Sequence, residues 1–379
     1  MTAGLPASLA DGLAAVLRGE EVPWGALGAG PTDVIAACAE EDLTGLVRRW
    51  LAARASADWP QAVRAELERR ARAATVREAL RRRELTAVLE ALTAQGILPI
   101  LFKGTPLAYG VYGEPGLRPR GDTDLLIRRD ERERVRRAMS ALGYGATNYS
   151  DGEFLFHQFE MARDDPFGVS HALDFHWKIS TESVFADLLA YDELAADCAS
   201  VPALGPHARG VGLVHALLLA CLHPVMHHRN EERLIWLYDV HLIASRLSPA
   251  EFERFARLAA AKGVAAICAH VLDLARSRLG TPVPGAVAAA LAAAAHATAE
   301  PSAVYLAPER RWSDELVSNV RGLPRWSDRL KLLREVAFPA PAYMLRAYGL
   351  AGGVASALLP ALYVHRGARG LWKVLRGRK

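Results

Sequence analysis

Residues 122–127 read Asp-Thr-Asp-Leu-Leu-Ile, two aspartates on either side of a threonine and then an apolar run. A short apolar run that follows a glycine turn is typical of a buried β-strand. Because side chains alternate along a strand, Asp122 and Asp124 are expected to project from one face. Two adjacent carboxylates repel each other unless a cation neutralises them, and oxygen ligands suit Mg²⁺. The pair therefore indicates a metal site, although isolated Asp-x-Asp sequences also occur in solvated turns.

A third carboxylate is expected on a neighbouring strand. Residues 169–179 alternate so that Asp174 and His176 share one face while apolar side chains take the other. An unpaired carboxylate in so apolar a strand would be costly to bury, and a cation shared with Asp122 and Asp124 would remove that cost. We therefore expect Asp122, Asp124 and Asp174 to be the metal ligands and the catalytic residues. His176 would tune Asp174, contact substrate, or satisfy a hydrogen bond at the strand end.

A phosphate-binding turn is predicted upstream of the aspartates. Residues 97–102 form an apolar run that reads as a strand, and the next three residues turn it into a helix. A glycine there lets backbone N–H groups approach an anion, and basic side chains before the aspartates add donors. The predicted nucleotide-binding residues are Lys103, Gly104, Thr105, Arg118 and Arg120. A metal pair, a base and a phosphate cradle are the parts that phosphoryl or nucleotidyl transfer requires.

These motifs together resemble a known family. Residues 101–105, 117–127, 173–177 and 221–239 are similar to the bacterial uncharacterised nucleotidyltransferase family of the DNA polymerase beta-like superfamily. The resemblance covers roughly residues 75–245. It implies a small mixed sheet flanked by helices, with Asp122, Asp124 and Asp174 as the metal triad and Gly104-Thr105 as the triphosphate turn.

An α+β fold is therefore expected, with predominantly helical regions on both sides of a small mixed sheet. We divide the chain into a helical N-terminal region (1–95), a nucleotidyltransferase core (96–180) and a helical C-terminal region (181–379) that forms the acceptor side. Periodic apolar segments predict helices around residues 211–222, 232–246, 251–279 and 284–299. The C-terminal region ends in a basic tail, residues 365–379.

Residues beyond the sheet, His223, Arg233 and Asp239, are candidates for the acceptor side, together with His176. His223 and His227 stand four apart on a predicted helix, and core or acceptor-pocket roles are favoured over zinc binding because no nearby cysteine completes a ligand set. Arg233 and Asp239 have helical spacing and would bind the acceptor, although an internal ion pair explains them nearly as well.

Composition and charge limit the partners. The net charge is only +4, and six basic residues without an acid lie in 365–379. No basic stripe with interleaved aromatics flanks the sheet, which makes a nucleic-acid acceptor unlikely. Residues 347–364 carry no charge, but their glycines and a proline favour a buried, broken helix over a membrane span, with a surface-attached amphipathic end as the alternative. Four dispersed cysteines and the lack of a signal-peptide pattern favour the cytoplasm.

The preferred hypothesis is an Mg²⁺-dependent nucleotidyltransferase with two metal ions, Mn²⁺ being an alternative. It would move a nucleoside monophosphate from a nucleoside triphosphate to a hydroxyl of a small-molecule or peptide or protein acceptor, and release pyrophosphate. One alternative is a catalytically inactive nucleotide-binding or regulatory protein on the same fold. Another is a glycosyltransferase, which the absence of a long alternating strand and helix pattern disfavours.

Overall fold

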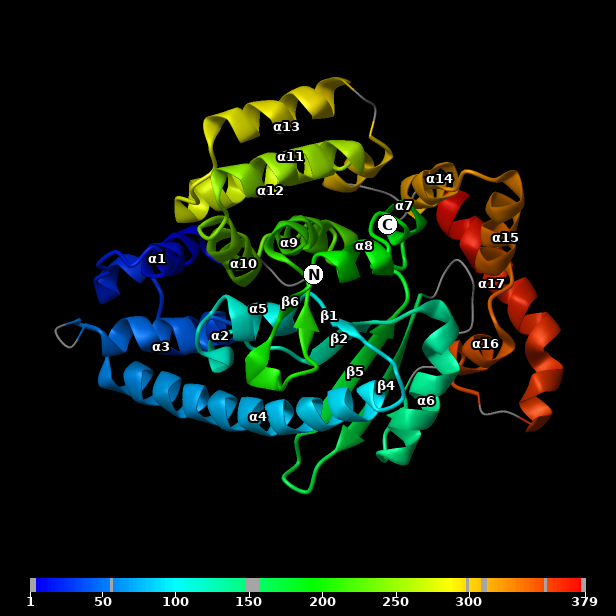
Figure 1. Cartoon of the computed structure of the whole chain (residues 1–379), viewed down its shortest axis with the longest axis horizontal. Coiled ribbons are helices and arrows are strands. Elements are labelled where there is room, and N and C mark those ends of the chain that lie inside the picture. Colours follow the sequence, from blue (N-terminus) through cyan, green and yellow to red (C-terminus); the bar gives the residue numbers. More distant parts are fainter. Residues whose placement is uncertain are drawn as a thin grey trace.

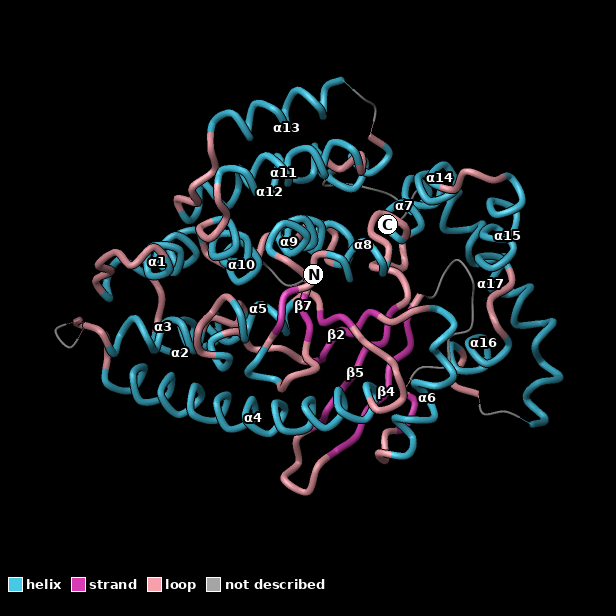
Figure 2. The backbone as a smooth tube through the Cα atoms, in the orientation of Figure 1, coloured by secondary structure: helices cyan, strands magenta, loops and turns pink. Residues whose placement is uncertain are grey.

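The computed structural model describes residues 5–54, 57–147, 157–297, 300–307, 312–350 and 353–375. Helices dominate it, and a single mixed sheet lies near the middle of the chain (Figures 1 and 2). The α+β class expected from the sequence is thereby confirmed.

The sheet has seven strands in the order β3-β4-β5-β2-β1-β7-β6. The pairs β2 with β5 and β1 with β7 are parallel, and the other neighbours are antiparallel. The strands are β1 (Ile100–Leu101), β2 (Asp122–Leu126), β3 (Gly145–Ala146), β4 (Gln158–Asp164), β5 (Ser170–His176), β6 (Ala199–Ser200) and β7 (Arg209–Gly210). The sheet thus extends past the 96–180 region through β6 and β7. The sequence also predicts a strand at 154–159, and residues 154–156 of it lie outside the described part of the chain.

Alternation along the strands gives the sheet two different faces. Leu125 of β2 and Leu173 and Phe175 of β5 pack on one side against α4 and α6. The opposite side, which carries Asp122, Asp124 and Asp174, faces α5, α9 and α10, and Leu126 and Phe102 join the larger core there. In Figure 1, α4 runs below the sheet and α9 and α10 lie above it.

The N-terminal region is helical, as predicted. Its helices are α1 (Ala7–Leu17), α2 (Pro31–Glu40), α3 (Thr44–Ala52) and α4 (Gln61–Thr93), with a 3-10 turn η1 at Trp24–Leu27. Side chains from α1 to α3 join those of α9, α10 and α12 in one continuous hydrophobic core. The N-terminal helices α1 to α3 and the C-terminal helices therefore stabilise each other through a core on one side of the sheet.

The helices within and just after the sheet are short. They are α5 (Gly104–Gly110), α6 (Arg132–Ala141), α7 (Ser183–Ala186) and α8 (Tyr191–Ala196), with 3-10 turns η2 (Pro115–Leu117), η3 (Arg129–Glu131) and η4 (Pro202–Leu204). The sequence predicts a helix over 129–142 that ends at Gly143, and α6 ends just before this glycine, which adopts a φ of 83° that other residues avoid.

The C-terminal region is also helical. It contains α9 (Leu213–His227), α10 (Leu234–Ala244), α11 (Pro249–Ala261), α12 (Ala265–Leu279), α13 (Gly285–Ala297), α14 (Trp312–Gly322), α15 (Trp326–Ala337), α16 (Pro341–Ala347) and α17 (Leu359–Leu375), with 3-10 turns η5 (Pro301–Leu306) and η6 (Gly353–Leu358). The segment predicted as one helix over 251–279 is two helices, because Gly263 takes a φ of 64° between them.

The uncharged segment 347–364 is broken, as expected, but it is not buried. Within its described part, Leu358 and Val364 are 50% and 73% exposed. The segment lies on an outer helical layer and has too few neighbouring elements to cover it. Among the described residues, none of the helices has the length and apolar character needed to cross a bilayer.

Candidate active site

The two central acids come together through strand register. In the parallel pair of β2 and β5, Asp124 lies directly opposite Asp174. Residues in register on adjacent strands point to the same face, so the two carboxylates lie side by side, both buried. Asp122 is two residues earlier, opposite Ala172, and it stays exposed at the rim. The predicted common face of the three acids is therefore confirmed.

Asp124 is held by two partners. Its Oδ1 accepts hydrogen bonds from the Lys103 ammonium at 2.6 Å and from His176 Nε2 at 3.0 Å. Burial would raise the pKa of Asp124, but the Lys103 charge and the bond to His176 outweigh it, and the pKa is lowered. Burial and the same Lys103 charge lower the pKa of His176 to about 4, so its imidazole is neutral at pH 7.

Asp174 has a different environment. Its Oδ2 accepts from Gln158 Nε2 at 3.2 Å, whereas the buried Oδ1 has no hydrogen-bond partner among the described residues. Burial and then the charges of Asp124 and Asp122 raise the pKa of Asp174 to about 7. Glu160, opposite Asp174 on β4, adds a further negative charge. A buried carboxylate oxygen without a partner, surrounded by other acids, is the environment that a cation relieves.

The group that fits a metal ion overlaps the predicted triad without matching it. Ligand atoms of Asp124, Asp174 and His176 lie within 4.8 Å of one another. Asp122 does not belong to this group. Loss of hydration at its carboxylate, followed by the charge of nearby Asp124, raises the pKa of Asp122. Asp122 therefore still interacts electrostatically with the site.

The predicted phosphate turn lies beside the acids. Lys103 has a φ of 57° and precedes α5, a strained conformation that turns its side chain to Asp124. Gly104 is partly exposed, but Thr105 is buried. A small cavity opens next to this turn. It is lined by Lys103, Gly104, Leu107, Arg118, Val211, Ala216, Leu219, Ala220, His223, Trp236 and Asp239.

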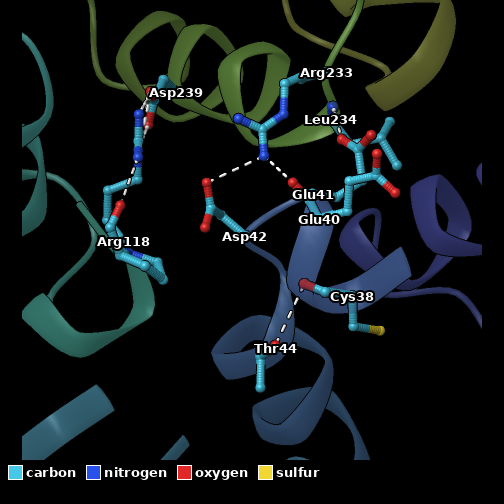
Figure 3. A network of polar contacts seen from close by, with 10 residues as sticks. Cys38, Glu40, Glu41, Asp42, Thr44, Arg118, Arg233, Leu234 and Asp239 are labelled. Atoms are coloured by element: carbon cyan, nitrogen blue, oxygen red, sulfur yellow. Dashed lines mark hydrogen bonds and ion pairs between the residues drawn. The ribbon is translucent and has the colours of Figure 1, made fainter. Parts of the chain in front are cut away.

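Arg118 and Asp239 form a buried ion pair. Arg118 Nε donates to Asp239 Oδ1 and Nη2 to Oδ2, each at 2.8 Å, and the Tyr112 hydroxyl donates to Oδ1 at 2.6 Å. Figure 3 shows Arg118 reaching from the segment before β2 to Asp239 on α10. The structure thus brings a predicted phosphate ligand and a predicted acceptor residue together as each other's partners.

Arg120 points away from the acids. Its guanidinium pairs with Glu78 of α4 at 2.6 Å and donates to the hydroxyl of Thr123 at 3.0 Å. Thr123 alternates with Asp122 and Asp124, so it lies on the opposite face of the sheet. The structure therefore does not bring Arg120 to the site.

Arg233 is likewise engaged elsewhere. It donates to the carbonyl of Glu40, the last residue of α2, and to Asp42 at 3.1 Å (Figure 3). Its guanidinium also lies 4.9 Å from the ring centroid of Trp236. Next to it, Glu41 accepts a hydrogen bond from the backbone N–H of Leu234 and so caps α10. These contacts join the N-terminal helices to α10.

The sequence indicates His223 and His227 but does not predict His228, Gln158 or Glu160, which also lie near the site. His223 packs edge-on against Trp236, with ring centroids 5.2 Å apart, and His228 lies 4.3 Å from Trp236. His223 Nδ1 and His227 Nε2 are buried, and neither has a hydrogen-bond partner in the described part of the chain. Burial, followed by the Lys103 charge, lowers the pKa of His227 to about 3. The spacing of four residues from His223 is the sequence feature that indicates His227, whereas no local sequence pattern distinguishes Gln158 or Glu160.

Comparison with known proteins supplies one match. A family model described as uncharacterised nucleotidyltransferase matches residues 28–305. The matched region includes the sheet, the acidic group and the helices from α2 to α13; it begins after α1 and ends before α14. None of the curated proteins matches the chain.

Proposed function

The chain belongs to the family of uncharacterised nucleotidyltransferases, which transfer a phosphorus-containing group, and from this premise we propose its reaction. The protein moves a nucleoside monophosphate from a nucleoside triphosphate to a hydroxyl of a small-molecule or peptide or protein acceptor, with release of pyrophosphate. The reaction depends on a divalent cation, Mg²⁺ or Mn²⁺.

One observation carries the proposal: Asp124 and Asp174 lie in register on parallel strands, with His176 beside them. The unpartnered Oδ1 of Asp174 supports the presence of a cation, since a buried anion otherwise lacks compensation. Asp124 and Asp174 would hold the ion, with Asp122 at the rim as a further ligand. When bound, such an ion stabilises the negative charge on transferring phosphoryl oxygens.

The chain's own residues supply orientation and proton transfer. The acceptor oxygen forms a bond to the α-phosphorus while the bond to the bridging oxygen breaks, and pyrophosphate leaves with the electron pair. The acceptor's proton passes to Asp174, whose carboxylate lies in register with Asp124 in the acidic group. Lys103 and Gly104 contact the triphosphate, and the neutral His176 orients Asp124.

The acceptor enters from the side of α9 and α10. The cavity beside Lys103 combines an apolar wall with His223 and the Arg118–Asp239 pair. His223 Nδ1 is buried without a partner, which supports a hydrogen bond to an acceptor group. Arg118 lines this cavity and is paired with Asp239, so it shapes the pocket.

The test uses a nucleoside triphosphate labelled at the α-phosphorus, a panel of hydroxyl acceptors, and Mg²⁺ or Mn²⁺. We expect pyrophosphate release and a labelled monophosphate on an acceptor. Asp124→Asn should lower turnover by about a thousandfold or more, because the central ligand is lost. Asp273→Asn, an exposed aspartate on α12, is the matched control and should keep full turnover.

Three results would contradict the proposal. Full turnover in Asp124→Asn would remove the acidic group from the chemistry. Release of a nucleoside diphosphate in place of pyrophosphate would indicate glycosyl transfer. Nucleotide binding without turnover, in the wild type and with every acceptor, would favour a catalytically inactive binding protein.

A further inference from the structure

The C-terminal end of the chain differs sharply in charge from the rest. Residues 321–379 contain twelve Lys or Arg and two Asp or Glu, a surplus of ten positive charges. Since the whole chain carries +4, residues 1–320 carry −6. The surplus includes 365–379 but begins well before it, and Arg376, Arg378 and Lys379 lie outside the described residues. This basic end also lies wholly beyond the family match at 28–305.

Helix α15 carries an exposed apolar face within this basic end. Trp326, Leu330 and Leu333 stand at positions i, i+4 and i+7, so they share one face, and they are 72%, 62% and 40% exposed. A separate face of α15 buries Leu332 against Leu323 of the preceding turn. The helix is therefore already packed on one side, and the exposed face is additional to that packing.

The charges of α15 are arranged around this face. Arg325 and Arg334 are exposed, and the Arg329 guanidinium lies 5.2 Å from the ring centroid of Trp326. Asp328 and Glu335 stand seven apart, on the side of the helix away from Trp326. Arginines thus flank the apolar face while the two acids point away from it.

The remaining elements of this end continue the pattern. Phe338, just after α15, is 64% exposed, and on α17 Val364 and Trp372 are 73% and 54% exposed. Both helices lie at the right-hand edge of the molecule in Figure 1, whereas α14 forms the link to the body. That link includes Asn319, which accepts from the backbone N–H of Val184 at 3.2 Å.

We propose that α15, with α17, docks the protein on an anionic lipid surface. The helix would lie in the plane of the interface with Trp326, Leu330 and Leu333 inserted among the acyl chains and the flanking arginines at the headgroups. Charge complementarity favours this occupant. A second copy of the chain would place one basic end, with its surplus of ten positive charges, against another of the same charge, and the two would repel. A nucleic acid would leave the aliphatic Leu330 and Leu333 without a partner.

The experiment measures co-sedimentation of the full chain with vesicles, and it needs no turnover. One set of vesicles is phosphatidylcholine, and the other is an equimolar mixture with phosphatidylglycerol. The test variant is Trp326→Ser with Leu330→Ser. The matched control is Phe167→Ser with Val76→Ser, since these two side chains are 70% and 61% exposed on the body of the protein. Arg325→Gln with Arg334→Gln tests the charges.

We expect wild type and control to bind the anionic vesicles alike and to bind neutral vesicles far more weakly. The apolar test variant should partition about tenfold or more weakly because inserted area is lost. Each arginine removed should lower the partition coefficient onto anionic vesicles roughly fivefold, and by a smaller factor at high salt. All variants should keep the wild-type melting temperature, since every substituted side chain is exposed.

Several outcomes would overturn the proposal. One is no binding to anionic vesicles at low salt; another is binding that Trp326→Ser with Leu330→Ser leaves unchanged. A dimer in sedimentation velocity that this variant abolishes would show that a second copy covers the face. Binding to duplex RNA that outcompetes the vesicles would show a nucleic-acid surface.

Discussion

Asp174 combines burial with two neighbouring negative charges, and this makes its ionisation unfavourable for the folded protein. Its folded pKa is about 7, against an ordinary value near 3.8. Below about pH 4 the group is protonated in both states. As pH rises toward 7 the unfolded chain releases the proton and the folded protein retains it, so stability falls across this interval and then levels off.

Asp174→Asn removes the free-energy cost of ionising this buried carboxylate in the folded protein. In the absence of divalent cations, we expect the variant and the wild type to melt alike near pH 4. At pH 8 the variant should be more stable by about 2–4 kcal/mol, from the linkage of a shift of this size. Thermal unfolding in EDTA from pH 4 to 8 measures the difference. A constant offset across that range would mean that Asp174 ionises normally in the folded protein.

The Arg118–Asp239 pair acts between elements, because it joins the segment before β2 to α10. Both side chains are buried, so removing one partner leaves the other charge uncompensated. Asp239→Ala should therefore destabilise the protein by about 3–5 kcal/mol. Removing both charges, as in Arg118→Met with Asp239→Leu, should restore much of that loss. Thermal unfolding of these two variants and of the wild type measures both effects.

A measurement of turnover distinguishes whether the Arg118–Asp239 pair positions the pocket or binds substrate. If it only positions the pocket, the double variant should recover activity along with stability. If either side chain binds substrate, stability returns and activity does not. Tyr112→Phe is a milder control, since it removes one hydrogen bond to Asp239 and should cost about 1 kcal/mol.

The elements that the sequence predicts well are those with clear periodicity. The alternation through Asp122 and Asp124 and around Asp174 predicts both strands and the shared acidic face, which follow from local geometry. The strands β6 and β7 have two residues each, too few for a pattern. The partners of Arg118 and Arg120 lie 121 and 42 residues away in the sequence, so only tertiary packing reveals that both guanidiniums are already paired.

At the scale of the whole molecule, the acidic site lies between the sheet and a core shared by the N-terminal and C-terminal helices, so ligand binding there should stabilise the entire body. A ligand at 100 times its dissociation constant adds about 2.7 kcal/mol, which corresponds to a shift on the order of a few degrees. Mg²⁺ with a nucleoside triphosphate should give this shift, and neither alone should give all of it, because Mg²⁺ binds through carboxylates plus substrate phosphates.

Asp122→Asn lessens repulsion among the acids, so the metal-free variant should melt at or above the wild-type temperature, while its shift with both ligands should largely vanish. Scanning fluorimetry with the four nucleoside triphosphates, with and without Mg²⁺, measures this and ranks the bases, and Asp273→Asn should shift like the wild type. If Asp122→Asn also shifts like the wild type, Asp122 takes no part in binding, and the cation is held by Asp124, Asp174 and His176 alone.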